Sequence, residues 1–134
     1  MSLEFLNIIL EKDVRYPKEA YEFVLSALNF AGQKYAEVLM ERESPHVTGQ
    51  ELLEAIREFA LEEYGPMAID LFNEWGIKYG IDFGNIVFNL VNNGFLAKTE
   101  QDSINDFQKC YTFHDAFVKP FQPVKRIITK QILN

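Results

Sequence analysis

The feature that most constrains the fold is a row of amphipathic segments in the middle of the chain, each bounded by glycine or proline. Apolar residues recur in each segment at spacings of three and four, the period of a helix with one buried face. The first segment begins with a capping box, in which Thr48 is the cap and the Glu51 side chain reaches back to it. Gly76 ends the second segment and Gly94 ends the third. The sequence predicts three helices, at 48–64, at 67–75 and at 82–93 with Asp82 as the cap of the third.

After Gly94 the period changes to that of short strands. Phe95–Lys98 and Cys110–Phe113 are candidate strands. The polar, acidic residues 99–108 between them are expected to form a long hairpin loop, with a turn of helix near Asp102–Phe107. Helix, short helix, helix and hairpin is the order of a winged helix-turn-helix. We therefore expect a winged-helix-like three-helix unit with a small β-hairpin.

Two further helices are expected before this unit. One covers residues 3–10, and a longer one runs from Pro17 to about Met40, with a bend at Gly32, where glycine weakens a helix. The expected fold is mainly α, of the α+β class, and forms one compact domain. Its parts are a helical pair at 1–44, the winged-helix-like unit at 48–113 and a basic C-terminal tail at 119–134, within a single domain spanning 1–134.

The charge distribution argues against a nucleic-acid partner. The net charge is −7, and residues 48–113 alone hold eleven acids and four bases. Helix 82–93 has no Lys or Arg to neutralise phosphates, and only its asparagines are suited to reading base edges. A winged-helix transcriptional regulator stays an alternative. Its nucleic-acid contacts would be made by Asn85, Asn89, Lys98, Lys125 and Arg126.

No catalytic constellation stands out. His114-Asp115 is a pair found among the metal ligands of phosphohydrolases, but those sites need more histidines, and only His46 remains. Cys110 and the two histidines lack the ligand spacing of a zinc site, and a cysteine in a strand is more often a buried apolar residue. We assign no catalytic residue, metal or cofactor. An enzyme with a carboxylate/His site built on His114 is the second alternative.

The aromatic content favours protein contacts. Aromatic residues make up 14% of the chain, and twelve of them are Phe. Tyrosine and tryptophan often anchor interfaces, so Tyr21, Tyr35 and Trp75 are candidate interface residues, although packing inside the domain explains them as well. A basic tail on an acidic body suggests self-association. The function expected is a non-catalytic protein-binding or assembly module, with a protein partner or a homo-oligomer.

The single cysteine excludes an internal disulfide, which favours a reducing compartment. The first ten residues are apolar but contain Glu4 and no leading Lys or Arg, unlike a secretory signal. No apolar run approaches the ~20 residues that span a bilayer. We expect a cytoplasmic protein without membrane contact.

Several stretches together are similar to a small family of uncharacterised bacterial proteins of about this length. The resemblance covers roughly residues 13–121 and implies a bacterial, cytoplasmic protein with one intact domain. That family has no assigned activity, so the resemblance assigns no functional residue. The stretches are RYPKEAYEFV at 15–24, TGQELLEAIREFALEEYGPMA at 48–68, EWGI at 74–77, DFGNIVFNLV, GFLAKTEQDS and FVKPF.

Overall fold

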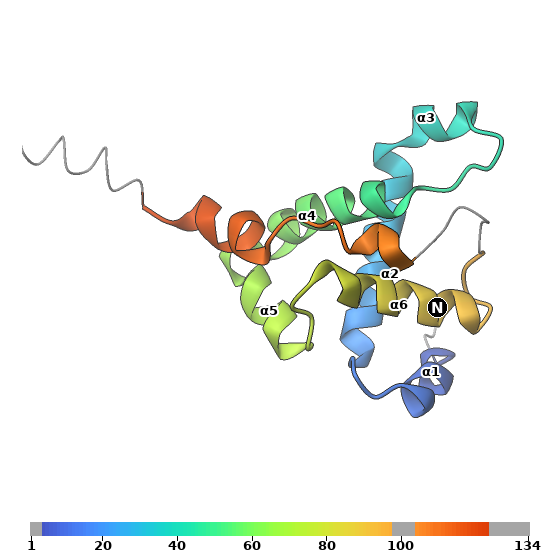
Figure 1. Cartoon of the computed structure of the whole chain (residues 1–134), viewed down its shortest axis with the longest axis horizontal. Helices are drawn as coiled ribbons and strands as arrows, with labels where there is room; N and C mark the ends of the chain where they lie inside the picture. Colours follow the sequence, from blue (N-terminus) through green and yellow to red (C-terminus); the bar gives the residue numbers. More distant parts are fainter. Residues whose placement is uncertain (1–3, 98–103, 124–134) are drawn as a thin grey trace, which may run out of the picture.

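The computed structural model describes residues 4–97 and 104–123, and helices make up most of them. Within these two ranges no strand occurs, so the predicted mainly α fold is confirmed. In Figure 1, α2 runs behind α4 and α6 and crosses both. The α-helices are α1 (Leu6–Lys12), α2 (Lys18–Lys34), α3 (Ala36–Glu41), α4 (Gly49–Tyr64), α5 (Ala68–Glu74) and α6 (Gly80–Asn92).

The long helix predicted from Pro17 to Met40 is two helices, so this prediction is wrong at the break. Gly32 lies inside α2, and the chain leaves the helical conformation at Tyr35, where φ is −103° and ψ is 17°. Glycine costs about 1 kcal/mol in a helix interior. Burial of Ala27 and Ala31 on the same helix offsets that cost. The residues after Tyr35 restart as α3.

Both predicted caps are used, in different ways. The capping box is confirmed: the Glu51 N–H donates to Thr48 Oγ1 at 3.1 Å, and the Thr48 N–H donates to Glu51 Oε1 at 2.8 Å. Asp82 lies inside α6, which begins at Gly80. Its carboxylate accepts from the backbone N–H groups of Lys78 and Tyr79, so it satisfies the unpaired donors from within the helix.

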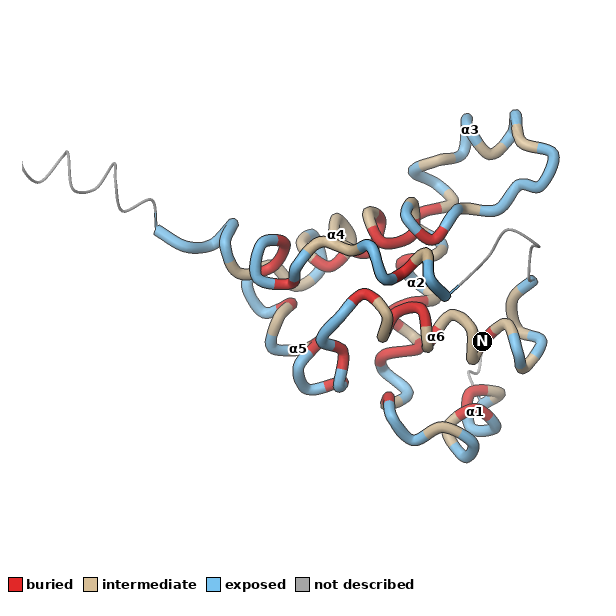
Figure 2. Tube along the Cα trace, in the orientation of Figure 1, coloured by how far each residue is buried: buried red, intermediate tan, exposed pale blue. Residues whose placement is uncertain are grey.

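The buried side chains form one apolar cluster, which draws on both the expected N-terminal pair and the expected three-helix unit. Figure 2 shows buried segments of α2, α4 and α6 turned toward one another. Each aromatic pair contributes about 0.5–1.5 kcal/mol beyond the burial of its area. Phe72 is the hub, with ring centroids 5.1–6.0 Å from those of Phe23, Trp75, Phe83, Phe113 and Phe117.

The predicted β-hairpin is wrong for the residues that the structure describes. Residues 95–97 and 110–113 form no strand, while Lys98 lies outside the described residues. The turn of helix expected near 102–107 is present as a 3₁₀ turn, η2 (Ile104–Phe107). It is followed by the π-helical turn η3 (His114–Val118) and the 3₁₀ turn η4 (Lys119–Phe121).

Residues 104–123, here called the strap, cross α4 and α6 instead of pairing as strands (Figure 1). Side chains take the place of a partner strand in satisfying backbone carbonyls. Gln50 Nε2 donates to the carbonyls of Asp106 and Lys109 at 2.6 and 2.7 Å. The Tyr111 hydroxyl donates to the Leu53 carbonyl at 2.7 Å. These bonds hold the strap against α4.

Three glycines allow the strap to pack closely against α4 and α6. A Cβ atom at Gly84 would lie 2.9 Å from Phe107 Cγ, and one at Gly49 would lie 2.8 Å from Asp106 Cβ. At Gly80 it would lie 2.4 Å from Cys110 Cβ. Such distances are too short for carbon atoms, so only glycine lets the strap approach α4 and α6 this closely.

Candidate functional site

The polar face of α6 is turned toward the segment that joins α1 to α2. Asn89 Nδ2 donates to Asp13 Oδ2 and to the Tyr21 hydroxyl, both at 2.9 Å. Asn85 Nδ2 donates to the Tyr16 hydroxyl at 3.0 Å, and that hydroxyl donates to Asp82 at 2.6 Å. The amides proposed as base readers are thus hydrogen-bonded within the chain. The other candidate nucleic-acid contacts, Lys98, Lys125 and Arg126, lie outside the described residues.

The same hydrogen bonds between α6 and the start of α2 shift the pKa values of the groups that they join. The Arg15 guanidinium beside Asp13 holds the pKa of that carboxyl well below its usual range, and Asn89 acts in the same direction. Burial, together with the hydrogen bond to Asp82, raises the pKa of Tyr16 to about 12. At neutral pH these hydrogen bonds therefore join the ionised Asp13 carboxylate to neutral phenols and amides, and they hold α6 to the start of α2.

Two of the three candidate interface residues lie in the core. Tyr21 is 0% exposed, and Trp75 is 8% exposed and packs against the rings of Phe23 and Phe72. Tyr35 is half-buried at the junction of α2 and α3, where the Lys34 ammonium lies 5.5 Å from its ring centroid. Of the three residues, Tyr35 is the one that the structure places beside an exposed helix.

The groups considered for catalysis are not assembled into a site. Burial raises the pKa of the Cys110 thiol to about 11, so it is protonated at neutral pH and a poor nucleophile. His114 Nδ1 lies 3.9 Å from Asp115 Oδ1, and both side chains are well exposed. Among the residues that the structure describes, no group of three or more His, Cys, Asp or Glu side chains is placed to hold a metal ion.

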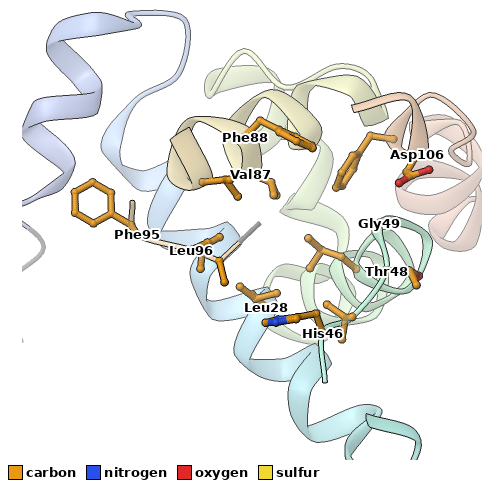
Figure 3. Close-up of a pocket in the computed structure, with 14 residues that line it drawn as sticks. Leu28, His46, Thr48, Gly49, Val87, Phe88, Phe95, Leu96 and Asp106 are labelled. Carbon is orange, nitrogen blue, oxygen red and sulfur yellow. The ribbon is translucent and has the colours of Figure 1, made fainter. Parts of the chain in front are cut away.

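An apolar pocket of about 270 Å³ opens where α2, α4 and α6 meet. Figure 3 shows Val87 and Phe88 on one side of this space and Leu28 on the opposite side. Its polar lining is sparse: His46, Thr48 and Asp106 stand at the edge, where the chain is at least partly exposed. The other main walls are Leu52 of α4, Val91 of α6 and Phe107 of the strap.

The pocket was not predicted from the sequence, because its walls come from four segments that are far apart along the chain. One signal was present. Val87 and Val91 belong to the predicted apolar face of the third helix, and both remain only half-buried in the folded chain. An apolar helix face that is too wide for the core it covers leaves such residues at a cavity.

A second unusual feature is α3, which has no buried residue. Val38 is 45% exposed and Met40 is 86% exposed. Residues 35–47, here called the arm, project from the body of the molecule (Figure 1). Helices of soluble proteins ordinarily bury one face, so α3 presents apolar side chains that the described part of the chain does not cover.

Ion pairs fix the two ends of the arm. Lys34 Nζ lies 2.5 Å from Glu58 Oε2 where the arm begins. On the return, Arg42 makes a two-pronged contact with Glu51, at 2.7 and 2.5 Å, and also donates to the His46 carbonyl. The Arg42 contact lowers the pKa of Glu51. The arm is therefore held to α4 at its base while α3 stays exposed.

Comparisons with family models, with curated proteins and with solved structures found no match to this chain. None of the described helices combines the length and the apolar character that crossing a bilayer requires.

Proposed function

We propose that the chain is a non-catalytic assembly module that binds a protein partner through its arm. The observation that carries the proposal is α3, a helix without a buried residue that exposes Val38 and Met40. The tethering of its base to α4 means that little conformational freedom is lost when a partner covers it, which favours binding.

The charges around α3 indicate the chemistry of the partner. Glu37, Glu41 and Glu43 flank its exposed apolar side chains. A complementary partner segment is therefore basic and apolar, since potentials of opposite sign favour association and specify orientation. Residues 124–134 of this chain have this composition, with three cations, no acid and several Ile or Leu residues.

The occupant we propose for the arm is residues 124–134 of a second copy. Figure 1 places α3 and the last described residues, 119–123, at opposite ends of the molecule. A tail that leaves one end and binds an arm at the other joins copies head to tail. Such a heterologous contact produces rings, or open chains if the rotation does not close.

The test is the molar mass in solution, measured by light scattering after size exclusion over a wide range of protein concentration. The full chain is expected to associate at low salt and to dissociate at high salt, because screening weakens charge pairs. Val38→Ser with Met40→Ser, and separately a chain that ends at Pro123, are expected to be monomeric. Val14→Ser is the matched control, since Val14 is 87% exposed but lies outside the arm.

A full chain that is monomeric at every concentration and salt would contradict self-assembly. If the serine variants dissociate the assembly and the shortened chain does not, the arm is the binding surface and the tail is not its occupant. If the shortened chain is monomeric and the serine variants associate normally, the arm is excluded.

The alternative of a nucleic-acid regulator gains no specific support from the described residues. The exposed charge is mainly acidic, and Asn85 and Asn89 already hydrogen-bond to Tyr16, Tyr21 and Asp13.

A further inference from the structure

The pocket between α2, α4 and α6 is apolar on most of its surface, and the described side chains leave it open. Its walls are aliphatic and aromatic and include Leu28, Leu52, Val87, Val91 and Phe107. Figure 3 shows Leu28 across the pocket from Val87. Burying such surface under an apolar ligand releases water from it and favours binding. Ligand sites in proteins commonly have this character, with a few polar groups that orient the ligand.

The volume limits the size of the occupant. A cavity of about 150 Å³ lined by apolar side chains holds benzene. A pocket of about 270 Å³ therefore holds a molecule of about the size of naphthalene or a short alkyl chain, with room for one polar substituent toward the open side. Long acyl chains and nucleotides are too large to be enclosed.

The apolar lining selects against ions, and the net charge of −7 of the chain disfavours anions in particular. Moving a carboxylate or phosphate from water into an apolar space costs desolvation, which an uncharged ligand avoids. An uncharged polar group can instead accept or donate hydrogen bonds at the edge, where His46 and Thr48 stand.

We propose that this pocket binds a small uncharged apolar molecule, a single ring system or short chain with at most one neutral polar group. The pocket includes His46 and Val47 at the base of the arm but not Val38 or Met40 of α3, whose substitution tests the assembly proposal, so the two proposals fail independently. Binding here does not depend on self-association, and assembly through the arm does not require a ligand in the pocket.

The test uses 1-naphthamide and 1-naphthoate, two probes of nearly the same shape that differ in charge. Each is titrated into the full chain at pH 8, where free histidine is neutral, and the methyl resonances of leucine and valine are followed by NMR. We expect the amide to bind one to one with a dissociation constant on the order of 0.1 mM. The shifts should be confined to methyl groups of the pocket such as those of Leu28, Val87 and Val91, and the naphthoate should bind about tenfold more weakly.

Val91→Phe fills the pocket and is expected to weaken binding of the amide at least about tenfold, since the added ring occupies the ligand's space. Val87→Phe is the second filling variant, in case the first fails to fold. The matched control is Val14→Phe, the same substitution at an 87% exposed position, which should bind like the wild type.

Any of four results would overturn the proposal, and three of them concern affinity. They are no saturable binding of the amide, equal affinity for the two probes, and unchanged affinity in both filling variants when these are shown to be folded. Shifts spread over the whole protein rather than the pocket would also overturn it, because they indicate non-specific binding.

Discussion

The strap and the arm both leave the helical body, and they return to it in different ways. The strap buries three aromatic residues, Phe107, Phe113 and Phe117, whereas α3 in the arm buries none. Both segments contain apolar side chains, so apolar content does not explain the difference. What differs is the surface that each segment meets.

The strap meets a surface shaped for it. Gly80 and Gly84 on α6 and Gly49 on α4 leave space for its backbone and for the Phe107 ring, and Gln50 satisfies two of its carbonyls. The arm is joined to α4 by ion pairs at its base, and none of the residues of α3 is buried. Burial thus depends on a matching recess and on satisfied backbone groups, and an apolar segment without them stays available to a partner.

The largest effect is expected for Phe107→Ala. Truncating a buried phenylalanine removes its apolar burial and leaves a cavity, which together cost about 3–5 kcal/mol. The corresponding truncation in the arm, Val38→Ala, removes a partly exposed side chain. It should change the free energy of unfolding of the monomer by less than about 0.5 kcal/mol. Urea unfolding followed by circular dichroism measures both. Similar losses for the two variants would remove the distinction between strap and arm.

A smaller effect is expected for Gly80→Ala. The added Cβ would lie 2.4 Å from Cys110 Cβ and 2.5 Å from the Phe107 carbonyl oxygen. Overpacking of this kind costs about 1–3 kcal/mol. Gly32→Ala is the paired control, because a Cβ there meets nothing within 4 Å, and removing a helical glycine should stabilise by about 0.5–1 kcal/mol. Thermal unfolding of the two variants should therefore shift in opposite directions. A stabilised Gly80→Ala protein would show that the strap is not tightly seated.

The smallest effect is expected for Glu51→Gln, which removes the charge that holds Arg42 at the base of the arm. Amide hydrogen exchange in α3 should accelerate about threefold at neutral pH, within the range for a partly exposed ion pair. The folded-state pKa of Glu51 is lowered from its ordinary value near 4.5, so its contribution is present above that value and is lost as pH falls through the folded pKa. The difference between variant and wild type should disappear at acidic pH. A difference that persisted there would assign the effect to something other than the ion pair.

Helices with clear caps could be predicted from the sequence. The box of Thr48 and Glu51 marks the start of α4, and glycines at 65, 76 and 94 bound the helices that follow. Each of these signals acts within one turn of the chain, so it keeps its meaning whatever the rest of the molecule does. This is why the three central helices were predicted nearly at their observed bounds.

The path of the strap, where a hairpin was predicted, and the pocket both depend on contacts between residues far apart in the sequence. Local sequence patterns did not reveal these contacts. Residues 110–113 alternate as a strand does, but Tyr111 bonds to Leu53 and Gln50 bonds to the carbonyls around Lys109. The roles of Asn85 and Asn89 were hidden in the same way. An amide that suits adenine equally suits the hydroxyl and carboxylate groups that Tyr16, Tyr21 and Asp13 present.

The seating of Cys110 against Gly80 has a consequence for chemical kinetics. The thiol is packed against the first turn of α6, and burial keeps it protonated at neutral pH. A thiol reagent reacts with the thiolate, so the raised pKa slows modification of the half-buried Cys110 while the strap is seated, and departure of the strap from α6 speeds it. With no other cysteine in the chain, a change in the labelling rate of the native protein reports a change in the seating of the strap without any added probe.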